Sequence, residues 1–144
     1  MNDVRRIFVD TSAWLALINR DERRHAVAIE FHRSLGQGVS RVTSWGVVAV
    51  TYTWLRHHTG FRSAERWLHE EADLEERGVL EVLYPTQESE GGIRRTLSRF
   101  ADQDLSYVDA FSLHIAQLRG DIDAFFAFDR HLALYGSLVL PEEV

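Results

Sequence analysis

The sequence contains no cysteine, which excludes disulfide bonds, thiol catalysis and cysteine-ligated zinc. It also has no apolar run approaching the roughly 18 residues that a membrane-spanning helix needs. We therefore expect no membrane association and, by default, a cytoplasmic location. Lysine is absent too, so all 16 basic residues are arginine. GC-rich coding explains this most simply, although the planar arginine fork also suits phosphate contacts.

A length of 144 residues with 45% apolar residues, including eight Phe and four Trp, is enough for one core. We expect residues 1–144 to form a single domain. The formal net charge of -6 argues mildly against a protein that binds nucleic acid through its whole surface. It remains compatible with an enzyme whose acids are concentrated in a metal site.

Short apolar runs alternate with segments of helical periodicity along the whole chain. Strands are predicted at residues 7–9, 39–43, 79–83, 124–128 and 137–140, and helices at 13–19, 25–35, 45–58, 61–77, 86–101, 107–119 and 130–134. This alternation predicts an α/β fold with a parallel sheet covered on both faces. The two consecutive helices at 45–58 and 61–77 indicate a helical hairpin.

Three aspartates fall at positions that such a fold brings together. Asp10 and Asp129 follow the first and fourth predicted strands directly, and Asp109 lies at the start of a helix. The carboxyl ends of parallel strands share one edge, where ligands bind in these folds. Two carboxylates 4 Å apart repel by roughly 4 kcal/mol at an effective dielectric constant near 20. A hard divalent cation, Mg²⁺ or Mn²⁺, offsets that repulsion.

Each aspartate also has a simpler structural interpretation. Asp10 and Asp129 are placed to begin the helices that follow them, with Ser12 as a further capping candidate. Asp109 stands three residues after Ser106, which is the spacing of a capping box with Asp in place of Glu or Gln. Each role is plausible alone, and it is the coincidence of all three positions that favours a shared site.

Three stretches resemble the conserved motifs of PIN domains in order and spacing. They are IFVDTSAW at 7–14, DLSYVDA at 104–110 and FAFDRHL at 126–132. The resemblance covers essentially the whole chain and implies a PIN-like three-layer fold, with a central, mainly parallel sheet flanked by helices. The short chain is most similar to the VapC-type toxins of bacterial toxin–antitoxin pairs.

That resemblance implies a Mg²⁺- or Mn²⁺-dependent endoribonuclease acting on tRNA or rRNA, with the three aspartates as metal ligands. Ser12 and Ser106 match hydroxyl positions that orient a ligand or a water, and Arg130 is placed to meet a phosphate, a surface salt bridge being the simpler role. The resemblance further implies a homodimer and a small VapB-type antitoxin. We expect the antitoxin to bind an apolar groove around the first two helices.

One position departs from the family pattern. PIN domains carry a glutamate early in the helix after the second strand, and this chain has Val50 in its place, within Ala49-Val50-Thr51. His57 lies seven residues later, about 10 Å along the helix, which is too far to substitute. We therefore expect weaker metal binding and impaired cleavage. A substitution made for production, a naturally degenerate member and sufficiency of three acids all fit the sequence.

Three functions compete at this point. The first is the endoribonuclease toxin, and the second is a non-catalytic PIN-fold module that binds antitoxin or RNA, which Val50 favours. The third, an aspartate-dependent phosphotransfer domain, is disfavoured because lysine is absent and Ser12 stands where a second acid is needed.

Among the tryptophans, Trp14 and Trp54 are expected in the core and Trp45 is the best candidate for exposure, where it can stack on RNA bases. The histidines are interpreted as surface residues.

Overall fold

A five-stranded sheet with order β3-β2-β1-β4-β5 organises the fold, and every neighbouring pair of its strands is parallel. The computed structural model describes residues 3–142. The strands are β1 (Arg6–Val9), β2 (Ser40–Ser44), β3 (Leu80–Leu83), β4 (Ala124–Phe126) and β5 (Leu138–Leu140). The predicted α/β class with a parallel sheet is confirmed.

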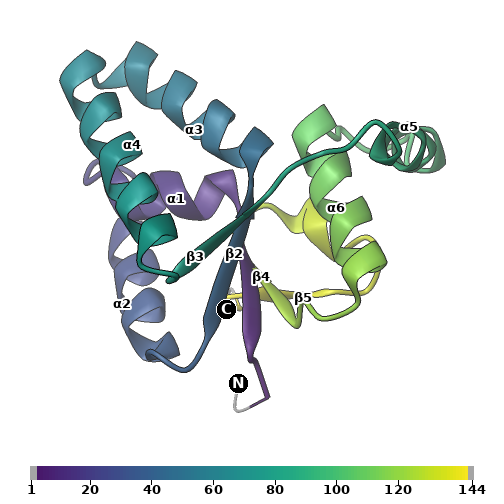
Figure 1. The fold of residues 1–144 in the computed structure, drawn as a ribbon, viewed down its shortest axis with the longest axis horizontal. Coiled ribbons are helices and arrows are strands. Elements are labelled where there is room, and N and C mark those ends of the chain that lie inside the picture. Colours follow the sequence, from purple (N-terminus) through teal and green to yellow (C-terminus); the bar gives the residue numbers. More distant parts are fainter. Residues whose placement is uncertain (1–2, 143–144) are drawn as a thin grey trace.

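Within residues 3–142, six α-helices and one 3₁₀ helix connect the strands. They are α1 (Thr11–Ile18), α2 (His25–Leu35), α3 (Trp45–His58), α4 (Phe61–Glu76), α5 (Ser89–Arg99), α6 (Tyr107–Arg119) and the 3₁₀ helix η1 (Arg130–Ala133). The predicted helical hairpin is present as α3 and α4, which pack along each other. Figure 1 shows this hairpin and the α5–α6 pair diverging from the sheet on opposite sides. No helix within residues 3–142 is long and apolar enough to cross a membrane.

The central strands are apolar at successive positions because helices cover both faces of the sheet. On one face Ile7 and Val9 pack with residues of α1 and α2, including Phe31. On the other face Phe8 packs with residues of α3 and α6, including Leu113. A strand buried on both sides is rigid, so the residue that follows β1 is held firmly in place.

Several boundaries differ from those predicted. The strand predicted at 124–128 ends at Phe126, so Asp129 does not follow it directly. The reason is a tertiary contact: the Phe128 N–H donates to Ser12 Oγ, 2.9 Å away, instead of continuing the strand ladder. The helix predicted at 86–101 begins only at Ser89, because Thr86 and Ser89 bond each other's backbone in a turn.

The capping of α1 also differs from expectation, and α3 buries one narrow face. Asp10 caps α1, and Ser12 donates its N–H to Asp10 rather than capping the helix itself. In α3 the buried positions are Val47, Thr51 and Leu55. Val50 is 42% exposed and lies off that face. The helices predicted at 25–35, 45–58 and 107–119 match in full, and the remaining strands and helices differ by no more than two residues at either end.

Candidate active site at the carboxyl edge of the sheet

Asp10 is the most deeply buried of the three aspartates, with 3% of its surface exposed. It follows β1, and its Oδ2 accepts hydrogen bonds from the Ser12 backbone N–H at 3.2 Å and from Ser12 Oγ at 2.8 Å. Its Oδ1 is buried and has no hydrogen-bond partner among residues 3–142. Burial raises the pKa of Asp10 to about 6, the Ser12 hydrogen bonds lower it, and the charge of Asp109 raises it.

Asp109 is positioned by the start of α6. Its Oδ2 accepts the Ser106 N–H at 3.1 Å while Ser106 Oγ accepts the Asp109 N–H at 3.0 Å, which completes the predicted capping box. Burial raises the pKa of Asp109, and the charge of Asp129 raises it further. Part of the carboxylate is thus committed to the helix start, and the rest faces other acids.

Asp129 begins η1 and brings a histidine into the site. Its Oδ1 accepts the His131 backbone N–H at 2.9 Å, and His131 Nδ1 lies 3.1 Å from the same oxygen. One ligand atom each from Asp109, Asp129 and His131 fall within 4.8 Å of one another. His131, interpreted from the sequence as a surface residue, is about one-third exposed, with a side-chain exposure of 32%, and it also contacts Asp129. Its signal in the sequence was the position two residues after Asp129 at the start of a short helix.

The serines and the arginine predicted as supporting residues have distinct placements. Ser12 Oγ bridges the ends of two strands, because it donates to Asp10 and accepts from the Phe128 N–H. Ser106 is exposed and caps α6. Arg130 is exposed and directly follows Asp129. Ser12 thus fixes the geometry between β1 and the segment that leads to Asp129.

Val50 lies on the side of α3 that faces the start of α6. Gly46, one helical turn earlier, packs so closely that an added Cβ would stand 3.2 Å from Val108 Cγ2. Residues four apart share a helix face, and Val108 precedes Asp109. The exposed Val50 side chain therefore lies on the side of α3 nearest the start of α6, and a valine offers no ligand atom.

This arrangement fits a hard divalent cation. Two aspartates with raised pKa values and an unpartnered buried Oδ1 are groups that gain from a positive charge between them. His131 adds a nitrogen donor at the rim. The chain's own hydrogen bonds leave the acids only partly satisfied, which is the opposite of what a purely structural cluster shows.

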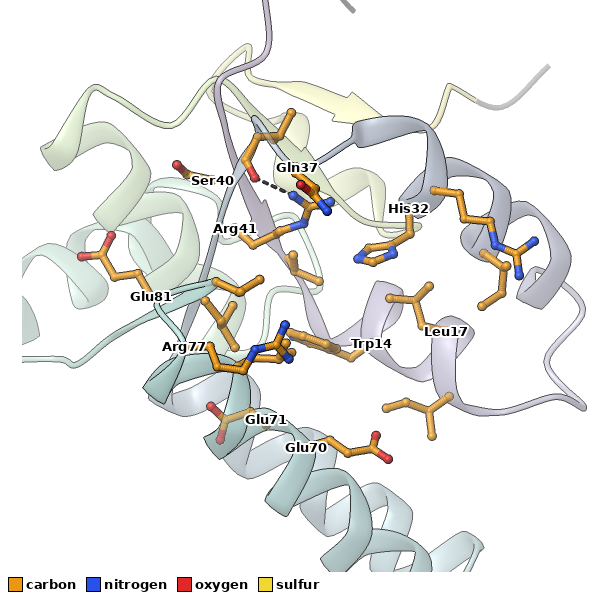
Figure 2. Close-up of a pocket in the computed structure, with 18 of the residues that line it drawn as sticks. Trp14, Leu17, His32, Gln37, Ser40, Arg41, Glu70, Glu71, Arg77 and Glu81 are labelled. Atoms are coloured by element: carbon orange, nitrogen blue, oxygen red, sulfur yellow. Dashed lines mark hydrogen bonds between the residues drawn. The ribbon is translucent and has the colours of Figure 1, made fainter.

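A separate groove lies away from the aspartates, between α1 and α2 on one side and α4 on the other. Its volume is about 1430 Å³. Figure 2 shows Trp14 and Leu17 along it, with His32, Arg41 and Arg77 bordering it. Its wall includes the amino-terminal ends of β2 and β3, the end of the sheet opposite to the aspartates.

The fold and the site define the class of this protein. A family model for the PIN domain matches residues 7–137. The chain therefore belongs to the PIN-domain family.

Curated relatives narrow the class. The chain is 33% identical over 137 residues to the 23S rRNA-specific endonuclease VapC20 of two strains of Mycobacterium tuberculosis, covering 94% of this chain and 99% of that protein. The crystal structure of M. tuberculosis VapC20, described as a sarcin-ricin loop cleaving toxin, superposes with a TM-score of 0.79 at 30% identity. It covers 92% of this chain and 96% of that chain.

Proposed function

We propose that this protein is a metal-dependent endoribonuclease toxin of the VapC type that hydrolyses RNA phosphodiester bonds. The observation that carries the proposal is the meeting of Asp109, Asp129 and His131, together with the buried, unpartnered Oδ1 of Asp10, which is close enough for the charge of Asp109 to raise the pKa of Asp10. Similarity to VapC20 over almost the whole chain supports a nuclease toxin. It also supports ribosomal RNA as the substrate, in preference to tRNA.

Asp10, Asp109 and Asp129 would hold the ion, and Mg²⁺ or Mn²⁺ matches their oxygen donors. When bound, such an ion lowers the pKa of a water and stabilises charge on phosphoryl oxygens. The chain's own groups set the geometry. Ser12 fixes Asp10 through Oδ2 and leaves Oδ1 for a ligand, and Arg130 is placed to meet a phosphate.

The groove between α1, α2 and α4 is the proposed site of the VapB-type antitoxin. Its volume of about 1430 Å³ leaves room for a peptide segment, and its apolar residues, including Trp14 and Leu17, offer contacts to an amphipathic helix. The arginines at its border, Arg41 and Arg77, suit acidic side chains of a partner. The single domain over residues 1–144, the homodimer and the cytoplasmic location remain proposals alongside this one.

Val50 is the observation in favour of the alternative, a PIN-fold module that binds without cleaving. We expect Val50→Glu to raise Mg²⁺-dependent cleavage by at least about 10-fold, because metal-site partners commonly change activity by 10- to 100-fold. The matched control is Val50→Gln, because glutamine has nearly the same shape as glutamate and adds no charge. Both variants and the unaltered chain would be incubated with ribosomal RNA and with an isolated stem-loop.

The outcomes separate the two functions. Cleavage by Val50→Glu that disappears in Asp109→Asn of the same background supports the nuclease and assigns the aspartate. If neither Val50→Glu nor the unaltered chain cleaves in Mg²⁺ or Mn²⁺, the binding module stands instead. Equal cleavage by Val50→Glu, Val50→Gln and the unaltered chain would show that position 50 does not hold the family's missing acid.

A further inference from the structure

Helices α3 and α6 begin in the same way beside the aspartates. In each, a serine is the N-cap, and its side chain accepts the N–H of the residue three positions later, at 3.1 Å for Ser44 and 3.0 Å for Ser106. In each, an aromatic residue occupies the first helical position, Trp45 in α3 and Tyr107 in α6. First-turn side chains lie beside the helix terminus, which here opens at the carboxyl edge of the sheet.

Both aromatic residues are exposed. Trp45 has 54% of its surface exposed and Tyr107 has 49%. The prediction that Trp45 is the exposed tryptophan is confirmed, since Trp67 is buried and Trp14 is partly buried in the core. A large aromatic ring that stays exposed to water does not contribute its hydrophobic stabilisation to the fold. Two such rings near the aspartates therefore suggest a role in binding.

Trp45 and Tyr107 stand at helix starts that contact each other. The residues that follow them, Gly46 and Val108, are in contact, and Asp109 comes next in α6. A third exposed aromatic residue, Tyr84, follows Leu83 of β3, which pairs in register with Ser44. Figure 1 shows the first turns of α3 and α6 at the same edge of the sheet.

Tyr107 is also fixed in orientation. Its hydroxyl donates to Glu90 of α5, and Glu90 Oε2 lies 3.7 Å from Arg94 Nε. The side chain of Arg94 is 77% exposed and interacts with the Tyr107 hydroxyl, so a cation stands at that end of the side chain and faces solvent. A fixed aromatic face with a neighbouring arginine is the combination that binds unpaired nucleotides, by stacking and by phosphate contact.

We propose that Trp45 and Tyr107 are stacking positions for unpaired RNA bases that flank the bond to be cut. This inference deepens the proposed endoribonuclease function and rests on it. With a net charge of -6, the chain gains little from a general attraction to phosphates. Stacking supplies affinity that does not depend on net charge, and it selects loops over duplexes because paired bases do not expose their faces.

The test measures binding rather than cleavage. A fluorescein-labelled RNA hairpin with an unpaired loop and a duplex of the same stem would be titrated with the chain, with Ca²⁺ in place of Mg²⁺ to occupy the oxygen ligands. We expect Trp45→Ala and Tyr107→Ala each to weaken hairpin binding by at least about 5-fold. Trp45→Phe, which keeps an aromatic face, should recover most of the affinity.

The matched control is Phe61→Ala. Phe61 is 47% exposed, like the two stacking residues, but it begins α4, beyond the far end of α3. Trp45 and the end of α3 are separated by about 20 Å at 1.5 Å per residue. Phe61→Ala and duplex binding by all variants should stay within about twofold of the unaltered chain.

Three outcomes overturn the proposal. Unchanged hairpin affinity in both alanine variants, with binding by the unaltered chain intact, removes the stacking role and leaves the endoribonuclease standing. A change in self-association by sedimentation velocity, without a change in RNA affinity, assigns the rings to a second copy of the chain instead. Failure of the unaltered chain to bind either RNA, together with no cleavage by Val50→Glu, removes both proposals.

Discussion

The buried charge of Asp10 destabilises the metal-free fold, and Asp10→Asn should relieve that cost. The pKa of this carboxyl rises from an ordinary 3.8 to about 6 in the folded chain, chiefly through burial. Each pKa unit corresponds to about 1.4 kcal/mol, so ionised Asp10 costs roughly 3 kcal/mol of folding free energy at neutral pH. Asparagine retains an oxygen for the Ser12 hydrogen bonds and carries no charge.

The sign of the pH dependence follows from proton binding. Between about pH 4 and pH 6 the folded state keeps a proton on Asp10 that the unfolded chain has released. Stability therefore falls as the pH rises through this window and stays reduced above it. Asp10→Asn lacks this contribution, so the difference between the two proteins should be absent near pH 4 and fully developed above about pH 6.

Urea unfolding in EDTA, followed by circular dichroism, measures this difference. At pH 7.5 we expect Asp10→Asn to be more stable by about 1 to 3 kcal/mol, because the new amide N–H needs a partner and offsets part of the gain. Saturating Mg²⁺ should stabilise the unaltered chain and reduce the gap. The control is Asp121→Asn, which should have the opposite effect. Hydrogen bonds from Arg119 lower the pKa of Asp121, so removing the Asp121 charge should destabilise the fold above pH 4.

Two results would refute this reasoning. Asp10→Asn that is no more stable than the unaltered chain at pH 7.5 in EDTA would mean that the buried carboxylate is already compensated. A difference that does not shrink as the pH falls to 4 would mean that the gain comes from packing or capping rather than from charge. Either result would also remove the electrostatic argument for a cation at Asp10.

Two further substitutions test the packing around the site by urea unfolding. Ser12→Ala removes the bridge between β1 and Phe128 and leaves the buried Phe128 N–H without its acceptor. We expect it to lower the free energy of unfolding by about 2 to 3 kcal/mol. A loss below about 0.5 kcal/mol would show that water replaces the bridge. Gly92→Ala would place a Cβ 2.1 Å from His114 Cε1. We expect it to destabilise the α5–α6 pair by about 1 to 3 kcal/mol. The adjacent Gly91→Ala meets only a flexible arginine terminus, so helix propensity should make it neutral or stabilising by up to about 1 kcal/mol; equal effects at the two glycines would contradict the contact.

Local sequence signals predicted the features that depend on local physics. The apolar run at Ile7–Val9 predicted β1, and the serine and aspartate three residues apart predicted the capping box of α6. The placement of Asp10 at the carboxyl end of β1 followed from the apolar run before it. Each of these needs only neighbouring residues and a general rule of topology.

Features set by contacts between distant segments were not predictable in this way. The end of β4 is decided by Ser12, more than a hundred residues earlier, which accepts the Phe128 N–H. The contribution of His131 depends on how η1 turns after Asp129. The groove between α2 and α4 exists only once the hairpin is in place, so amphipathic helices alone could not give its shape.

Restoring an acid at position 50 should change the electrostatics of the aspartate site. Burial raises the pKa values of Asp10 and Asp109, and a neighbouring charge raises each further, that of Asp109 for Asp10 and that of Asp129 for Asp109. A glutamate at position 50 would add a fourth negative charge beside them. Val50 is 42% exposed, so solvent screens the added repulsion to about 1 kcal/mol or less.

We therefore expect Val50→Glu to unfold at a lower temperature than Val50→Gln in EDTA, by about 1 to 4 °C for a chain of this size. In saturating Mg²⁺ the order should reverse, because a fourth carboxylate strengthens ion binding and binding to the folded state alone raises its stability. Thermal unfolding of the two variants with and without Mg²⁺ gives the comparison. Identical melting temperatures in both conditions would place residue 50 outside the electrostatic reach of the aspartates, and the family's fourth acid would then have to be sought elsewhere in the chain.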